Sequence, residues 1–151
     1  MAGEIFTLEQ SLYCLMIESP ATRRQLRQNT RRLGAAVEMM NAKAMSCGRT
    51  GTHFANAHGL HDDEHYTTAR DLAKIMMAAL EYEKFQEIYS TNRYTLPATN
   101  LHEERVLVTT NYLIDASFTA DYYDSRVIGG KTGFITPADG AVRACGESGK
   151  S

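Results

Sequence analysis

A short stretch near the C-terminal end, residues 127–134 (VIGGKTGF), constrains this chain more than any other. Two β-branched apolar residues, Val127 and Ile128, open the stretch, which is typical of a buried strand. Glycines then surround a lysine and a threonine, and such small residues let the backbone of a ligand come close. On its own the stretch fits three interpretations: the strand of a binding site, a phosphate-binding loop or an ordinary edge strand.

The composition indicates one globular domain with an uneven distribution of charge. The chain has 151 residues, of which 43% are hydrophobic and 23% charged, so it can bury a core and does not resemble a disordered protein. Five of its 16 basic residues are arginines between residues 23 and 32; without them 11 bases (16 − 5) face 18 acids, a net charge of −7 (11 − 18). This acidic remainder argues against a nucleic-acid-binding surface. The three cysteines are widely spaced, which favours neither a disulfide framework nor a zinc pair.

Helices are expected in the first two thirds of the chain and strands in the last third. Thr7 and Gln10 form a capping box for the first helix, and Thr68 with Asp71 marks the start of the clearest one. Ser19 follows the first helix just before Pro20, where it is either a functional hydroxyl or an ordinary helix-end residue. Periodicity predicts helices over 7–17, 37–47, 69–80 and 82–89, and extended segments over 94–97 and 105–109. In the second of these helices Ala44 and Met45 are expected on one core face, and in the third Leu72 belongs to a wide apolar stripe.

Two motifs point to other chemistry and lack the context that they need. His61, Glu64 and His65 match the H-x-x-E-H pattern of zinc peptidases, but that pattern needs a helix, and these residues precede the start of one. Gly130-Lys131-Thr132 matches the end of a phosphate-binding loop, but that loop has a glycine where Ser125 stands and opens a helix. A zinc-dependent hydrolase therefore stays as an alternative to the prediction below, and the phosphate loop is disfavoured.

Four segments, taken together and in this order, resemble one known family. They are residues 12–19 (LYCLMIES), 37–44 (VEMMNAKA), the His-Gly-Leu segment 52–71 and the K-T-G strand 130–134. The sequence resembles the D-alanyl-D-alanine carboxypeptidases among the low-molecular-weight penicillin-binding proteins, which are serine peptidases of bacterial cell-wall metabolism. A lone K-T-G is weak, whereas K-T-G downstream of the His-Gly-Leu segment is specific.

The resemblance implies acyl transfer through a serine nucleophile. In this family the serine of an S-x-x-K motif attacks the bond between two terminal D-alanines, and water releases the acyl-enzyme; no cofactor is implied. Ser19 corresponds to the serine of the family's S-x-N motif, and Lys131 supplies positive charge beside the proton path. Thr132 is expected to contact the substrate carboxylate, and Gly133 to let the strand lie close to the substrate backbone.

The sequence departs from the family at two places in its first part. No S-x-x-K occurs upstream of Ser19, so the chain is expected to begin inside the catalytic domain. Ala21 stands where S-x-N has its asparagine. We therefore expect the chain to be inactive alone, and a non-catalytic fragment of the penicillin-binding fold is the alternative.

The anomalous basic segment 20–36 interrupts the resemblance, and three interpretations stay open. It is a basic helix for an acidic partner or membrane surface, a solvated polar segment, or the product of a frame slip. A second slip is expected after Ala138, over residues 139–151, where the resemblance fades again.

These expectations together define a fold and a setting. The fold is predicted to be α/β, of the penicillin-recognising serine hydrolase type, with an antiparallel sheet flanked by helices and incomplete at both ends. Residues 1–151 would form a partial transpeptidase-like catalytic domain. The implied partners are a peptidoglycan stem peptide ending in D-Ala-D-Ala and β-lactam inhibitors, without nucleic acid. Family resemblance places the protein in the extracytoplasmic cell envelope, the full-length protein being membrane-associated, although no signal peptide or anchor is visible here.

Overall fold

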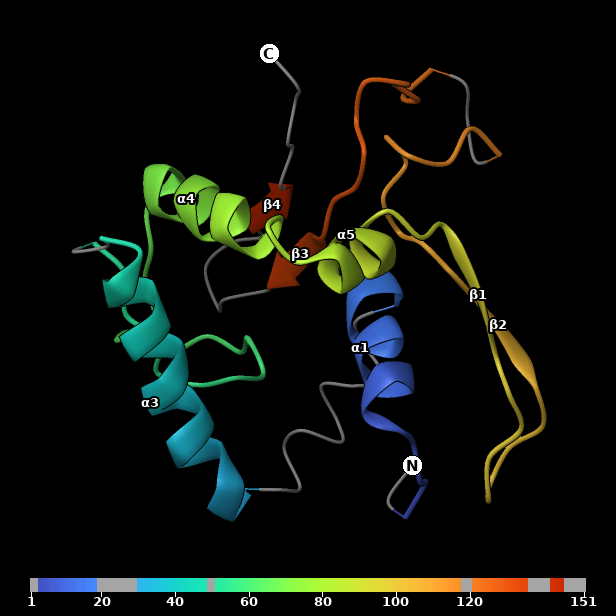
Figure 1. Cartoon of the computed structure of the whole chain (residues 1–151), viewed down its shortest axis with the longest axis horizontal. Helices are drawn as coiled ribbons and strands as arrows, with labels where there is room; N and C mark the ends of the chain where they lie inside the picture. The colour runs from blue at the N-terminus through green and yellow to red at the C-terminus, as the bar shows by residue number, and fades with distance from the viewer. Residues whose placement is uncertain (1–2, 19–29, 49–50, 118–120, 136–141, 146–151) are drawn as a thin grey trace.

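The structure is a computed structural model that describes residues 3–18, 30–48, 51–117, 121–135 and 142–145. The described residues form helices and two antiparallel two-stranded ladders, β1–β2 and β3–β4. Figure 1 shows α1, α5 and the β1–β2 ladder on one side, α3 and α4 on the other, and β3–β4 between them. The elements are α1 (Leu8–Ile17), α3 (Thr30–Ser46), α4 (Ala69–Ala79), α5 (Glu83–Tyr89), β1 (Arg93–Leu96), β2 (Arg105–Val108), β3 (Thr132–Ile135) and β4 (Val142–Cys145).

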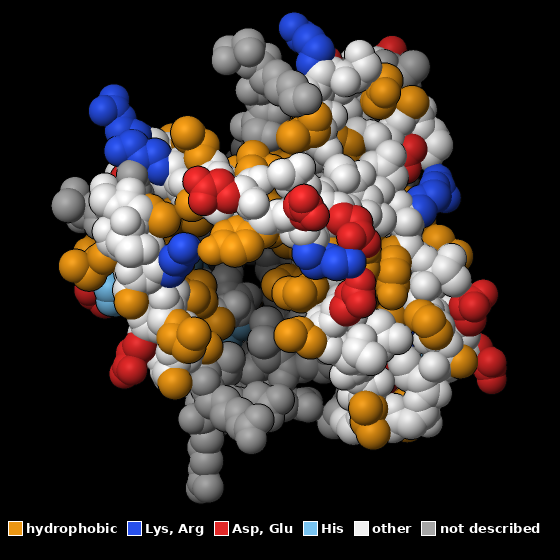
Figure 2. Space-filling view, in the orientation of Figure 1, with side chains coloured by type: hydrophobic (Ala, Val, Ile, Leu, Met, Phe, Trp, Pro, Cys, Tyr) orange, Lys and Arg blue, Asp and Glu red, His pale blue; other side chains and the backbone are white. Residues whose placement is uncertain are grey.

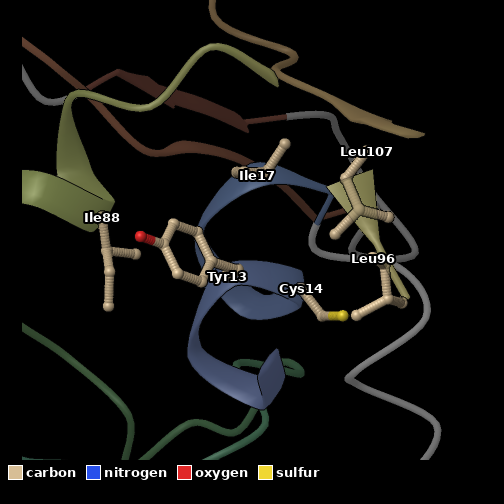
Figure 3. Close-up of a cluster of buried hydrophobic side chains, with 6 residues drawn as sticks. All are labelled: Tyr13, Cys14, Ile17, Ile88, Leu96 and Leu107. Carbon is tan, nitrogen blue, oxygen red and sulfur yellow. The ribbon is translucent and has the colours of Figure 1, made fainter. Parts of the chain in front are cut away.

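The main core of the described residues lies where α1 packs against α5 and the β1–β2 ladder. The ring of Tyr13 stacks on that of Tyr94 at 3.9 Å between centroids, and its hydroxyl donates to Glu87 Oε1 at 2.6 Å. Burial, and then the bond to Glu87, raise the pKa of Tyr13 to about 12, so its hydroxyl stays a donor. The close-up in Figure 3 shows the six buried side chains of this cluster: Tyr13, Cys14, Ile17, Ile88, Leu96 and Leu107.

Local sequence signals place the helix starts as predicted. The Thr7 hydroxyl accepts from the Gln10 amide and the Gln10 side chain accepts from the Thr7 amide, which confirms the capping box of α1. At α4 the Thr68 hydroxyl accepts from the Asp71 amide at 3.1 Å. The Asp71 carboxylate also accepts from Thr52 Oγ1 at 2.8 Å. Asp71 therefore bonds the cap of α4 through its amide and the preceding loop through its side chain.

Two predicted boundaries are wrong. α3 begins at Thr30 rather than at residue 37, because the intervening arginine, leucine and alanine residues favour a helix even without a strong apolar pattern. Val127 and Ile128 were expected in a buried strand, but β3 begins only at Thr132, and Ile128 is 39% exposed. The glycines that follow Ile128 interrupt the strand before it can extend backwards.

The side of the molecule with α3 and α4 leaves apolar side chains exposed. In α3, Ala44 is buried, whereas Met45, which was expected on the same core face, is 73% exposed. In α4, Leu72 is exposed although it belongs to the predicted apolar stripe. Figure 2 shows hydrophobic side chains at the surface on both the α3 side and the α1 side of this face. Within the described residues these helix faces therefore lack a covering layer.

Candidate substrate-binding site

The K-T-G motif lies where the chain enters β3. Lys131 precedes the strand, Thr132 is its first residue, and both side chains are half-buried. Lys131 Nζ donates to the carbonyl oxygen of Thr132 at 2.5 Å, so the ammonium group is held close to the strand that carries the threonine hydroxyl. A cation and a hydroxyl donor in adjacent positions can together receive an anionic ligand such as a carboxylate.

Close packing on α5 fixes the chain just before this motif. Gly129 is buried against Tyr89, the last residue of α5, which is itself buried. A Cβ at Gly129 would lie 2.5 Å from the Tyr89 carbonyl oxygen and even closer to its ring atoms Cδ1 and Cε1. The glycines of this stretch were expected to admit the backbone of a ligand. The structure shows that Gly129 is needed instead for the approach of α5.

A loop after β2 supplies a hydroxyl to the motif. Thr110 Oγ1 lies 2.5 Å from Thr132 Oγ1, at a position where either oxygen can be the donor. The residues on either side of Thr110 are buried: Thr109 is 4% and Asn111 2% exposed. Thr110 itself is exposed. The buried neighbours therefore anchor the loop, and the Thr110 hydroxyl faces the motif.

A second connection leads from this loop back to the motif. The Asp124 amide donates to the Leu113 carbonyl at 3.0 Å, and the Val127 amide donates to the Asp124 carbonyl at 3.0 Å. The Asp124 carboxylate also accepts from the Arg126 guanidinium and from its backbone amide, and these bonds lower the pKa of Asp124 to about 2. The loop, this turn and the packing on α5 together set the position of Lys131 and Thr132.

Three of the four predicted site residues lie in the described chain, and they are consecutive: Lys131, Thr132 and Gly133. Ser19 lies outside the described residues, so its relation to the motif stays a prediction. Sequence reasoning missed Thr110. The signal that points to it is a polar run directly after an apolar strand, because side chains at strand ends are free to face a site.

The zinc alternative is wrong for the described residues. Residues 61–65 are not helical: the His65 amide donates to the Asp62 carbonyl across a turn at 63–64, so His61 and His65 are not presented on one helix face. His65 Nδ1 accepts instead from the Ala55 amide at 3.3 Å, and its ring lies edge-on to Phe54. The part of the chain that the structure describes contains no group of three His, Cys, Asp or Glu side chains able to hold a metal ion.

The His-Gly-Leu segment has a structural role in this arrangement. His53 and Tyr66 pair through two backbone hydrogen bonds of 2.8 and 3.0 Å. The Asn41 amide on α3 bonds both the N–H and the C=O of Phe54, at 2.8 and 2.9 Å, as a neighbouring strand would. Gly59 takes the left-handed conformation with φ +68°. The segment therefore ties α3 to the start of α4.

The phosphate-loop interpretation also fails on geometry. Such a loop opens a helix whose N-terminus holds the phosphates. Here Lys131 is followed by strand β3, which pairs antiparallel with β4, with Thr132 opposite Cys145.

Comparison with known proteins places this site in a family. The sequence model of the family described as D-alanyl-D-alanine carboxypeptidase, peptidase family S11, matches residues 33–147. This range contains the loop after β2, the K-T-G motif and the His-Gly-Leu segment. The chain belongs to the D-alanyl-D-alanine carboxypeptidase family of peptidases.

Individual relatives agree with this assignment. The chain is 33% identical over 113 residues to the D-alanyl-D-alanine carboxypeptidase DacF of Bacillus subtilis, a match covering 75% of the chain and 27% of that protein. It is 28% identical over 103 residues to the D-alanyl-D-alanine carboxypeptidase of Streptomyces sp. strain K15, covering 63% of the chain and 35% of that protein. The chain thus spans about a third of the length of these curated relatives.

Solved structures confirm the predicted fold. The Streptomyces K15 DD-transpeptidase superposes with a TM-score of 0.73 at 24% identity, over 100% of this chain and 64% of that one. A D-alanyl-D-alanine carboxypeptidase from Mycobacterium tuberculosis gives 0.66 at 24% identity, over 97% and 57%. The fold is therefore α/β of the penicillin-recognising serine hydrolase type.

The bounds of the family match bear on the two segments where the resemblance was expected to break off. The family match extends to residue 147, so the expectation that the resemblance fades after Ala138 is wrong. The match begins at residue 33, which leaves most of the basic segment 20–36 outside it. Among the described residues, no helix is both long and apolar enough to cross a membrane.

Proposed function

We propose that this chain provides the substrate-carboxylate site of a serine-type D-alanyl-D-alanine carboxypeptidase, which removes the terminal D-alanine of peptidoglycan stem peptides. The observation that carries the proposal is the pair of donors at the entry to β3, Lys131 Nζ and Thr132 Oγ1, inside the range that matches the family. A peptide ending in D-Ala-D-Ala presents a carboxylate, which is the anion that a cation and a hydroxyl suit.

Each motif residue has a distinct task in this proposal. Lys131 supplies positive charge near the carboxylate and the proton path, and Thr132 donates a directional hydrogen bond to one carboxylate oxygen. Gly133, without a side chain, leaves the strand edge open to the peptide backbone. Ser19 is the serine that, by family resemblance, corresponds to the serine of the S-x-N motif. β-Lactams would occupy the same site as inhibitors.

Acyl transfer needs an activated nucleophile in addition to this site. The printed sequence contains no S-x-x-K, the motif that carries the nucleophile in the family. The 151-residue chain by itself is then a binding module for the carboxylate-terminated peptide. Peptide binding and acyl-enzyme formation are therefore tested in separate experiments.

The binding proposal is tested with two synthetic peptides that differ only at the C-terminus. One ends in D-Ala-D-Ala with a free carboxylate, and the other carries a C-terminal amide. Calorimetric titration of the chain is expected to give tighter binding of the acid, and Thr132→Val is expected to reduce that preference. Equal binding of the acid and the amide by the wild-type chain would refute the carboxylate site.

Covalent labelling separates a catalytic chain from a non-catalytic one. A fluorescent penicillin marks proteins that form an acyl-enzyme, and a denaturing gel shows the label. We expect no label on the 151-residue chain. A label that withstands denaturation would show that the chain carries its own nucleophile and would contradict the binding-module proposal.

A further inference from the structure

Thr110 on the loop after β2 is the described residue whose side chain contacts the Thr132 hydroxyl, with the two Oγ1 atoms 2.5 Å apart. We propose that Thr110 is a positioning residue, which holds the Thr132 hydroxyl in the orientation that binds the terminal carboxylate of the peptide. This inference rests on the proposed function, because it assumes that Thr132 meets the carboxylate.

The chemistry of two adjacent hydroxyls supports a directional role. Each hydroxyl has one proton to donate and two lone pairs to accept with. A carboxylate can only accept, so Thr132 must direct its proton toward the ligand. Thr110 is then the donor to Thr132, and the two bonds form a chain O–H···O–H···O⁻ in which each bond polarises the next. Without Thr110 the Thr132 hydroxyl would be free to rotate away.

The accessibility of the pair agrees with this role. Thr110 is exposed and Thr132 half-buried, so a ligand can reach the hydroxyls from the solvent side. A pair that served only to hold the fold together would gain more from being buried, since exposed hydrogen bonds compete with water.

The loop has its own anchors, which do not involve the Thr110 side chain. The Thr109 amide donates to the Asn92 carbonyl at 2.8 Å. The Asn111 amide donates to Thr109 Oγ1 at 3.1 Å, and Asn111 Oδ1 accepts from the Leu113 amide at 3.1 Å. Removing the Thr110 hydroxyl should therefore leave the loop in place, so a change in binding can be read separately from a change in folding.

The test measures the binding of the acid and amide peptides to three variants of the 151-residue chain. Thr110→Val keeps the shape but loses the hydroxyl, and Thr110→Ser keeps the hydroxyl. Thr95→Val replaces an exposed threonine on β1 and is the matched control. We expect Thr110→Val to weaken binding of the acid by roughly two- to tenfold, the range for one neutral hydrogen bond, and to leave amide binding and the melting temperature unchanged. Thr110→Ser and Thr95→Val should bind the acid like the wild type.

The outcomes distinguish this inference from the proposed function. If Thr132→Val loses the preference for the acid while Thr110→Val keeps wild-type binding, the positioning role is wrong and the carboxylate site stands. If Thr110→Val weakens acid and amide equally, or lowers the melting temperature, the residue acts on the fold and the inference is also wrong. If the wild-type chain does not prefer the acid at all, the proposed function itself has failed.

Discussion

Replacing Gly129 by alanine tests whether the motif is held in place by its packing on α5. The added Cβ would lie 2.5 Å from the Tyr89 carbonyl oxygen, whereas ordinary contact begins at 3.4 Å. The backbone must therefore move by about 0.9 Å at this point (3.4 − 2.5). A side chain alone cannot absorb this shift, because the obstructing oxygen belongs to the backbone of α5.

Overpacking of this kind costs about 1–3 kcal/mol of the free energy of unfolding. In a chain of this length, that corresponds to a decrease in melting temperature of roughly 3–10 °C. Urea unfolding followed by circular dichroism measures the free energy directly. The strain would also displace Lys131 and Thr132, so binding of the acid peptide should weaken in the same variant.

Gly34→Ala is the matched control for Gly129→Ala. Gly34 lies in α3, and an added Cβ there meets nothing within 4 Å. Alanine in a helix is about 0.5–1 kcal/mol more favourable than glycine, so this variant should be neutral or more stable. If both alanine variants unfold at the same urea concentration as the wild type, the close approach of Gly129 to Tyr89 does not hold.

Three smaller predictions concern the scaffold. Burial lowers the pKa of His65, so unfolding takes up a proton below about pH 6.5. The wild type should therefore lose stability as the pH falls from there toward the folded pKa. His65→Asn keeps an acceptor for the Ala55 amide and should lose less stability between pH 8 and pH 5.5, as measured by thermal melts at the two values. Thr68→Ala removes the cap of α4 and should cost about 1 kcal/mol in urea unfolding, whereas Thr68→Ser should cost little. Gly59→Ala forces a left-handed backbone at φ +68° and should cost about 1–2 kcal/mol; a melting temperature equal to that of wild type would contradict this conformation.

Features encoded by neighbouring residues could be predicted from the sequence. The capping residues Thr7 and Thr68 predict the starts of α1 and α4 because each hydroxyl bonds an amide three residues away. The K-T-G motif is equally local, since Lys131 and Thr132 are adjacent in the chain. Family resemblance then gave this motif a chemical meaning that its composition alone does not have.

Features that depend on distant residues could not be predicted in this way. No periodic pattern links Gly129 to Tyr89, or Thr132 to Thr110, because these contacts arise only when α5, the loop after β2 and β3 come together. Exposure is equally hard to predict: the apolar stripe of α4 specified a buried face, yet Leu72 is 45% exposed in the described part of the chain. Periodicity identifies the apolar face of a helix but not what covers it.

The most direct test of the central claim is to map the peptide on the isotopically labelled chain by nuclear magnetic resonance. Titration with the free-acid D-Ala-D-Ala peptide should shift the amide signals of Thr132, Gly133 and Thr110, and titration with the C-terminal amide should shift them less. Signals from the His53–Tyr66 pairing should stay in place in both titrations. Equal shifts with both peptides, or shifts confined to the His53–Tyr66 region, would contradict a carboxylate site at the entry to β3.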